Sequence, residues 1–388
     1  MSEYQYYEFQ AVDRPLTKDE MTALRLLSTR ATITSTRFVN VYNWGDLRGD
    51  PLKMMKDYFD AHVYVANWGT SRLMLRLPLS VVDSNEVQRY CVADGAAMHV
   101  TSTHVILDLS SEEEGGSGWI EDEDAEGWMP ALLPLRGDLA SGDLRALYLA
   151  WLATLQADMV DEEALEPPVP PGLGKLSAPL TALVEFLRID EDLIAVAATQ
   201  SGETELPALA ARDLEQWVRA LPAAEKDGLL LRLLQGDAPH LSAELLTRFR
   251  RERAPSTRAP SAADRGRTAA DLLAAAEHRA ETRRRREAAR EAQARARRER
   301  EEAAARAAYL EGLAGSEEAM WRQVEMLIET KRPADYDQSV RLLVDLRDLS
   351  VRQQTSAEFA SRLQQVRVRH ARKPSFLSRL DRAALPHG

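Results

Sequence analysis

The chain has 388 residues, of which 45% are hydrophobic and 29% charged, and its formal net charge is −11. Such a length allows two or three domains with cores of their own, and the apolar content excludes collagen-like and wholly disordered proteins. Cys91 is the single cysteine, which excludes a disulfide framework and a thiolate zinc site within one chain.

The N-terminus shows none of the features of a signal peptide, since a basic start and an apolar run are both missing. No run of 18 apolar residues predicts a membrane span either. We therefore expect a cytoplasmic protein that has no contact with membranes.

The sequence divides by composition. Residues 1–175 hold 28 acidic and 14 basic residues, whereas residues 254–388 hold 20 acidic and 27 basic ones. Three stretches predict linkers: an acidic, Gly-rich one at 110–127, a Pro-rich one at 161–175, and an almost non-apolar, disordered one at 254–267. The expected parts are an α+β domain at 1–160, a helical domain at 176–253, a long charged helix at 268–313 and a helical tail at 314–388.

In the first part, local signals alternate between strand and helix. In chain order we first expect a strand at 4–12, a helix opened by the capping box Thr17–Glu20, a β-rich stretch at 31–44 and a helix after Asp50-Pro51. A hairpin of 62–66 with 72–77, a short helix capped by Asp83, and strands at 98–100 and 104–109 should follow. The last element is an apolar helix at 144–155, which we expect to cover one sheet face. This mixed order favours an α+β fold over an all-parallel sheet.

The tripeptide Asn-Trp-Gly occurs twice in this part, at 43–45 and at 67–69. Two exposed tryptophans at loop tips could face one ligand. Alternatively, Asn and Gly make a turn at the end of a strand and Trp caps the core. We favour the second interpretation.

The rear of the chain is expected to be helical, and stripes such as Leu214–Leu221 and Leu229–Leu234 should bury against each other. In the tail, Ser316 and the Thr355–Glu358 pattern predict helix starts, and the helices resemble a tetratricopeptide-like hairpin without its signature.

Between Leu273 and Tyr309 the sequence is almost entirely Ala, Arg and Glu. These residues form helices well, but they offer no apolar stripe to a core. We expect a free spacer helix, or one that pairs along a weak alanine seam as in a coiled coil.

One face of that helix carries a row of arginines, which we call the arginine row: Arg279, Arg283, Arg286, Arg290 and Arg297. The row could contact an anionic partner, either a nucleic-acid backbone or the acidic first part of another copy. The alternative, which we favour, is a solvated face that confers solubility. No aromatic lies between Phe249 and Tyr309, so base stacking is not expected there.

Motifs of the common catalytic and cofactor sites are missing. The sequence has no Gly-rich phosphate loop, no H-E-x-x-H and no C-x-x-C, so no cofactor and no metal site are predicted. Asp60 and His62, next to Asp57 at a helix-to-strand junction, are the only weak candidates for an acid and a base. A helix cap and the start of a strand explain them equally well.

Two stretches carry a resemblance. The run from Tyr4 to Pro78, with DRPLT, FVNVYNWGD, YFDAHVYVANWGT and LMLRLP, resembles an uncharacterised family of bacterial proteins without an assigned activity. The run DYDQSVRLLVDLRDLSVRQQ and the following RHARKPSFLSRLDRAAL are similar to helical tails of bacterial SWIM-type zinc-finger proteins. The zinc motif of that family is absent, so zinc binding does not carry over; the resemblance implies a role beside nucleic-acid-linked machinery.

Three hypotheses follow. The first is a non-enzymatic protein-interaction or scaffold protein whose helical tail docks another protein. The second is a nucleic-acid-binding protein that contacts the backbone through the arginine row. The third is an enzyme of unknown reaction with its site near Asp60 and His62. Because no catalytic constellation stands out, we lean against an enzyme.

Overall fold

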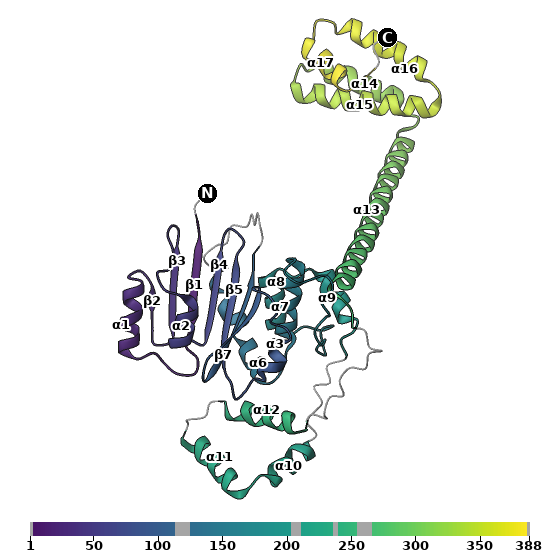
Figure 1. Ribbon diagram of the computed structural model, residues 1–388. Helices are drawn as coiled ribbons and strands as arrows, with labels where there is room; N and C mark the ends of the chain where they lie inside the picture. The colour runs from purple at the N-terminus through teal and green to yellow at the C-terminus, as the bar shows by residue number, and fades with distance from the viewer. Residues whose placement is uncertain (1–2, 113–124, 203–210, 236–239, 254–265, 386–388) are drawn as a thin grey trace. The chain divides into compact units, whose positions relative to one another are not determined.

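The computed structural model describes residues 3–112, 125–202, 211–235, 240–253 and 266–385 (Figure 1). The chain divides into two compact units, residues 1–283 and 284–388, and each is described by itself. Among the described residues, none of the helices combines the length and the apolar character that crossing a bilayer requires.

A seven-stranded antiparallel sheet forms the centre of the first unit, with the strand order β2-β3-β1-β4-β5-β7-β6. The strands are β1 (Gln5–Gln10), β2 (Thr32–Ile33), β3 (Arg37–Tyr42), β4 (Ala61–Ala66), β5 (Ser71–Pro78), β6 (Ala96–Val100) and β7 (His104–Ser111). With the helices of the same unit, the sheet confirms the predicted α+β class.

The helices of the first unit are α1 (Lys18–Leu27), α2 (Pro51–Asp57), α3 (Ser84–Gln88), α5 (Trp128–Leu132), α6 (Pro134–Ala140), α7 (Arg145–Gln156), α8 (Ala178–Leu187), α9 (Glu191–Ala198), α10 (Ala211–Ala220), α11 (Ala223–Gln235) and α12 (Leu241–Arg253). The long helix α13 (Ala269–Leu313) follows and continues into the second unit.

Local sequence signals set several of these elements. The capping box at Thr17 opens α1, where the Thr17 side chain accepts from the Glu20 N–H and the Glu20 carboxylate accepts from the Thr17 N–H. The Asp50 side chain caps α2, with Pro51 in its first turn. The predicted hairpin is β4–β5, in which Val63 pairs with Leu73. These predictions are confirmed.

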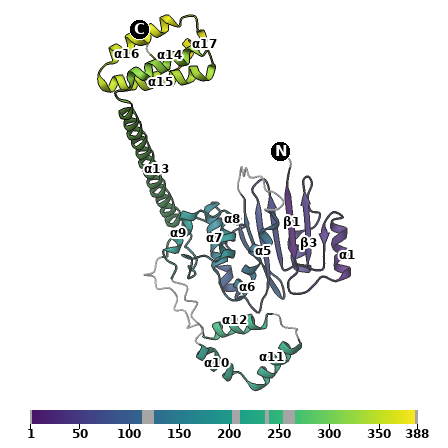
Figure 2. The same cartoon turned by 180° about the vertical axis from the view of Figure 1, so that it is seen from behind.

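One face of the sheet is apolar and covered by helices. Alternate residues of the central strands, such as Val63, Leu75 and Leu107, are fully buried in one cluster with the helices α5 to α8. Figure 2 shows these helices in front of the sheet. Helix α7 buries every residue from Ala146 to Leu155, so the predicted cover of one sheet face is confirmed.

The opposite face is apolar over only part of its area. Phe9, Phe38, Met74 and Ile106 form a second buried cluster, together with side chains from α1 and α2. Farther along the same strands the residues of this face are polar, among them Arg72 and Asp108, and they form an ion pair.

The predicted domain boundary at 161–175 is not where the structure divides. Leu173 lies in that stretch and is buried in the apolar cluster on the helix-covered face of the sheet. The same cluster contains Leu183 of α8, Leu193 of α9 and Leu272 of α13. The physical reason is that α8 and α9 have apolar stripes that the sheet core accepts directly. Most of the other two linkers, 110–127 and 254–267, falls outside the described residues.

The helices α10 to α12 bury little. Trp217, Leu221 and Phe249 form a small cluster of their own. The predicted burial of the whole Leu229–Leu234 stripe is wrong, because four of its leucines are more than half exposed: Leu230, Leu231, Leu233 and Leu234.

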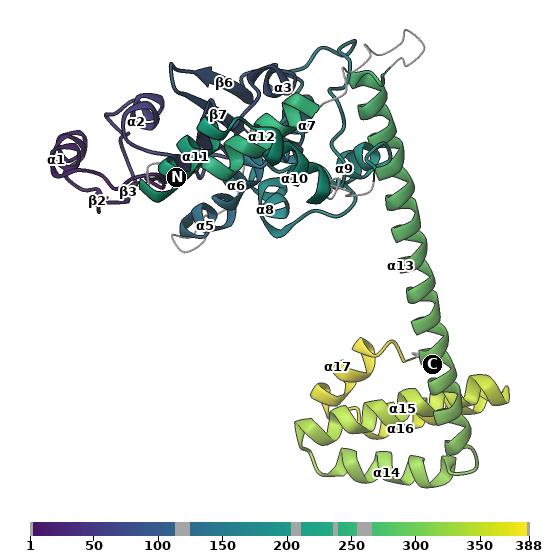
Figure 3. The same cartoon turned by 90° about the horizontal axis from the view of Figure 1, so that it is seen from below.

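The second unit ends in four helices, α14 (Glu317–Glu329), α15 (Pro333–Gln353), α16 (Ser356–Arg369) and α17 (Pro374–Arg382), seen together in Figure 3. Trp321, Leu343, Phe359 and Phe376 come from one helix each and share a core. Helices α14 and α16 start next to the predicted residues Ser316 and Thr355, but neither side chain makes a capping hydrogen bond.

Candidate functional site

Asp60, one of the two catalytic candidates, is fully buried at the start of β4. Its carboxylate accepts hydrogen bonds from the backbone N–H groups of Val12 (2.6 Å) and Asp13 (2.9 Å). The Arg76 guanidinium of β5 donates to the same carboxylate from Nε (3.1 Å) and Nη2 (2.7 Å). Both carboxylate oxygens therefore have partners within the fold.

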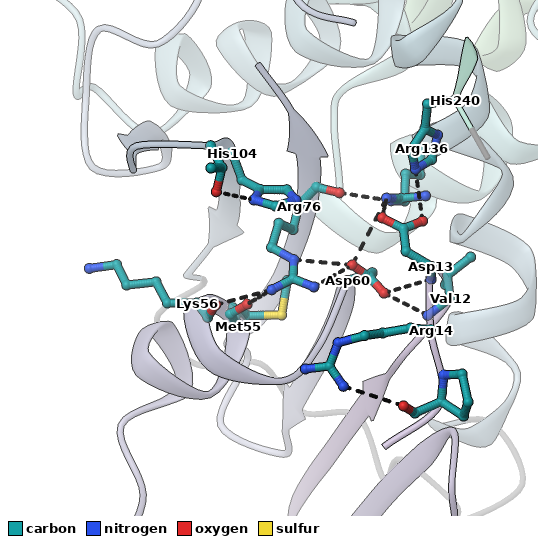
Figure 4. Close-up of polar contacts among 12 residues, drawn as sticks. Val12, Asp13, Arg14, Met55, Lys56, Asp60, Arg76, His104, Arg136 and His240 are labelled. Carbon is teal, nitrogen blue, oxygen red and sulfur yellow. Dashed lines mark hydrogen bonds and ion pairs between the residues drawn. The ribbon is translucent and has the colours of Figure 1, made fainter. Parts of the chain in front are cut away.

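The network around Asp60 joins several elements (Figure 4). Arg76 Nη1 donates to the carbonyl oxygens of Met55 and Lys56 at the end of α2. Arg136 of α6 donates to the Arg76 carbonyl oxygen (2.7 Å) and to Asp13 Oδ2 (2.6 Å). The network thus ties α2 and α6, which belong to opposite faces, to the same end of the sheet.

Electrostatics keep Asp60 ionised. Burial alone would raise the pKa of its carboxyl, but the N–H groups of Asp13 and Val12 and the charge of Arg76 outweigh it, and the pKa lies below the usual range. A general acid needs a raised pKa, so this environment suits a buried structural anion.

His62, the second candidate, lies on the same sheet face but has different partners. Its Nδ1 is 2.9 Å from the backbone carbonyl oxygen of Glu8, and its ring stacks on Phe9 with the centroids 3.9 Å apart. Burial lowers the pKa of His62 to about 3, so the ring is neutral at neutral pH. The pairing of Asp60 and His62 as acid and base stays a prediction, and the contacts of the two side chains supply no support for it.

The members of the arginine row differ in their partners. Arg279 and Arg283 bind the Asp192 carboxylate of α9 at 3.1 and 2.8 Å, within the first unit. Farther on, Arg297 pairs with Glu301 one turn along the same helix, at 2.7 Å. Arg286 and Arg290 are exposed. An anionic partner would therefore compete with Asp192 for the first two arginines.

The two Asn-Trp-Gly motifs end in different surroundings. Both glycines have a positive φ, 83° at Gly45 and 103° at Gly69. Glycine adopts this backbone conformation more readily than other residues do. The tryptophans do not cap the core as we expected, because Trp44 is 67% and Trp68 44% exposed. The Arg30 guanidinium lies over the Trp44 ring, 4.8 Å from its centroid, whereas Trp68 lines a cavity together with Tyr64 and Arg72.

The remaining candidates for chemistry are accounted for by local contacts. Cys91 is buried, and burial raises the pKa of its thiol to about 12, so it is inert at neutral pH. His99 lies 3.4 Å from Asp108, whereas His104 contacts the Thr103 hydroxyl. Nowhere in the described part of the chain do three His, Cys, Asp or Glu side chains gather as a metal site would need.

Two surfaces emerge only from the structure. One is the exposed leucine face of α11, formed by Leu230, Leu231, Leu233 and Leu234. The other is a groove of about 580 Å³ between α14 and α16 in the tail, with Trp321, Met326 and Val366 in its lining. The leucine run was visible in the sequence, but not which of its members the neighbouring helices would leave uncovered.

Comparison with known proteins finds no family model, no curated protein and no solved structure that matches this chain.

Proposed function

We propose that this chain is a cytoplasmic, non-enzymatic protein-interaction protein. The observation that carries the proposal is the exposed leucine face of α11, where four neighbouring leucines are each more than half exposed. Large contiguous apolar surfaces are uncommon on proteins that act alone, and they are typical of sites that bind other proteins.

The geometry of α11 supports this reading. Leu230, Leu231 and Leu234 fall within an arc of about 100° of the helix, and Leu233 extends the arc on one side. Leu229, one turn before Leu233 and about 40° from it around the helix, packs against the small cluster around Trp217 and Phe249. A partner helix with an apolar stripe of its own would cover the leucine face as helices commonly cover one another.

The docking tail is the second part of the proposal. The groove between α14 and α16 is lined by Trp321, Met326 and Val366 together with polar and charged residues, and Met326 is 65% exposed. Arg362 and Arg369 border it, each paired with a glutamate of α14. Such a groove suits an amphipathic segment of a partner protein.

The test uses the full-length chain in cells with a photo-crosslinking amino acid at Leu234. We expect a discrete protein adduct. The matched control carries the same amino acid at Gln216, an exposed polar position on α10, and should give no such adduct. Adducts of the same size from both positions would contradict the proposal.

A second variant separates partner binding from internal packing. Leu231→Glu with Leu234→Glu should abolish the adduct formed from a crosslinker at Leu230 and leave the thermal unfolding temperature within about 2 °C, because exposed positions tolerate charge. A large fall in that temperature would mean that the leucines cover their own chain, and the proposal would fail.

Backbone-directed nucleic-acid binding ranks below this proposal, because Arg279 and Arg283 already bind Asp192. An ionic-strength series on DNA and RNA distinguishes the two. Affinity that is present at 50 mM salt and falls steeply as salt rises would favour nucleic acid.

A further inference from the structure

A cavity of about 380 Å³ lies on the partly open face of the sheet and has no part in the proposed function. Tyr7, His62, Arg72 and Asp108 line it from four adjacent strands, β1, β4, β5 and β7. Trp68, from the β4–β5 turn, also lines it. The sheet thus supplies a rigid floor, which is where a precise binding site is expected.

His62 has one nitrogen without a partner. Its Nδ1 lies 2.9 Å from the Glu8 carbonyl oxygen, which can only accept, so Nδ1 carries the proton. Nε2 of the neutral ring is then an acceptor, and it is buried without a hydrogen-bond partner in the part of the chain that the structure describes. A ligand that donates to Nε2 would satisfy a group that is otherwise costly to bury.

The tyrosines of the cavity use their protons elsewhere. The Tyr7 hydroxyl donates to Asp46 Oδ1 (2.6 Å), and the Tyr64 hydroxyl donates to Gln5 Oε1 (3.0 Å). Their rings lie side by side with centroids 4.6 Å apart. The two side chains therefore offer the cavity acceptor oxygens and aromatic surface rather than donors.

The charge of the cavity is negative. Arg72 donates to both oxygens of Asp108, at 2.8 and 2.6 Å, so these two charges neutralise each other. Two further carboxylates line the cavity, those of Asp94 and Glu112, and both residues are exposed. A cation is the complement of such a site, and the aromatic rings of Tyr64 and Trp68 favour a cation as well.

We propose that this cavity binds a small organic cation that donates hydrogen bonds, a primary ammonium or a guanidinium group. His62 Nε2 accepts one of its hydrogen bonds, and Asp94 and Glu112 supply the opposite charge. The site is independent of the leucine face of α11, so the two proposals stand or fall separately.

The experiment is a calorimetric titration of the full-length chain with agmatine, which carries both groups, at low ionic strength. We expect saturable binding of one equivalent. Bis(trimethylammonium)butane, which carries the same charge as agmatine but no N–H or O–H donor, should bind at least tenfold more weakly, because it cannot donate a hydrogen bond to Nε2. Equal affinities for the two probes, or no saturation by agmatine, would overturn the proposal.

Two pairs of substitutions test the charge. Asp94→Asn with Glu112→Gln should weaken agmatine binding at least tenfold. The control, Glu162→Gln with Glu163→Gln, changes the net charge equally at exposed positions that do not line the cavity, and it should weaken binding less than twofold. Equal losses in both variants would show non-specific attraction and overturn the site.

His62→Phe tests the acceptor, because phenylalanine can keep the stacking on Phe9 while removing Nε2. Agmatine affinity should fall at least tenfold, and the affinity for bis(trimethylammonium)butane should stay within twofold. An unchanged agmatine affinity would overturn the role of His62. If this variant does not fold, the charge variants and the comparison of the two dications still decide the proposal.

Discussion

The two faces of the sheet differ in how completely other elements cover them. On the covered face, Leu75 and Leu107 lie in a continuous apolar core beneath α5 to α8. On the opposite face, apolar cover reaches Met74 and Ile106, while Arg72 and Asp108 line an open cavity. Because strand residues alternate between faces, one set of strands supplies both the stabilising core and the polar surface available to ligands.

The largest expected effect concerns the charge network that joins helices of both faces. Asp60→Ala should lower the free energy of unfolding by about 3–5 kcal/mol, because Arg76 would stay buried without its anion. Urea unfolding followed by circular dichroism measures the change. The control Asp57→Ala, at an exposed neighbouring position, should change it by less than about 0.5 kcal/mol. Equal effects would mean that the network does not hold the faces together.

The next prediction compares the faces directly within β7. Leu107→Ala on the covered face should lower the free energy of unfolding by about 2–5 kcal/mol, since it leaves a cavity in a closed core. Ser110 lies three residues farther along β7 and faces the open side of the sheet. Ser110→Ala should change the free energy of unfolding by less than about 0.5 kcal/mol. The same unfolding measurement applies to both. A small loss for Leu107→Ala would show that the covered face is loosely packed.

A smaller effect should appear as pH dependence. The pKa of His62 is lowered to about 3 in the fold and is near 6.5 in the unfolded chain, so below pH 6.5 the unfolded state binds the extra proton. The stability from the neutral ring is complete above pH 6.5 and declines as pH falls towards 3, by about 1.4 kcal/mol per pH unit.

When the pH falls from 7 to 5, the free energy of unfolding of the wild type should therefore decrease by about 2 kcal/mol more than that of His62→Gln, because glutamine does not titrate in this range. Urea unfolding at the two pH values measures the difference. Parallel losses would show that the folded chain does not hold the pKa of His62 below its value in the unfolded chain.

Much of the fold was predictable, because it depends on signals a few residues long. The capping box at Thr17, the Asp50-Pro51 start of α2 and the β4–β5 hairpin act through neighbours in the chain. The composition of α13 predicted a long helix in the same way, and residues from Arg284 to Arg300 are indeed exposed. The predictions of helix caps at Ser316 and Thr355 were less accurate, because neither side chain makes a capping hydrogen bond.

The candidate sites were less predictable, because they depend on which strands become neighbours. Asp60 and His62 stand two residues apart, yet one meets Arg76 and the other Glu8 and Phe9. Nothing in the spacing indicated that His62 would share a cavity with Asp94 and Glu112. The Arg283–Asp192 pair joins α13 to α9, 91 positions apart in the chain.

By itself, the sequence determined the kinds of elements, their order and the absence of the common cofactor motifs, because propensity and capping act between near neighbours. Tertiary structure alone decided that residues on both sides of the Pro-rich stretch share one core and that four α11 leucines stay exposed. It also decided that His62 Nε2 has no hydrogen-bond partner among the residues that the structure describes. Burial and hydrogen bonding depend on contacts between distant parts of the chain, and the strand order β1-β4-β5-β7 creates those contacts only once the sheet has formed.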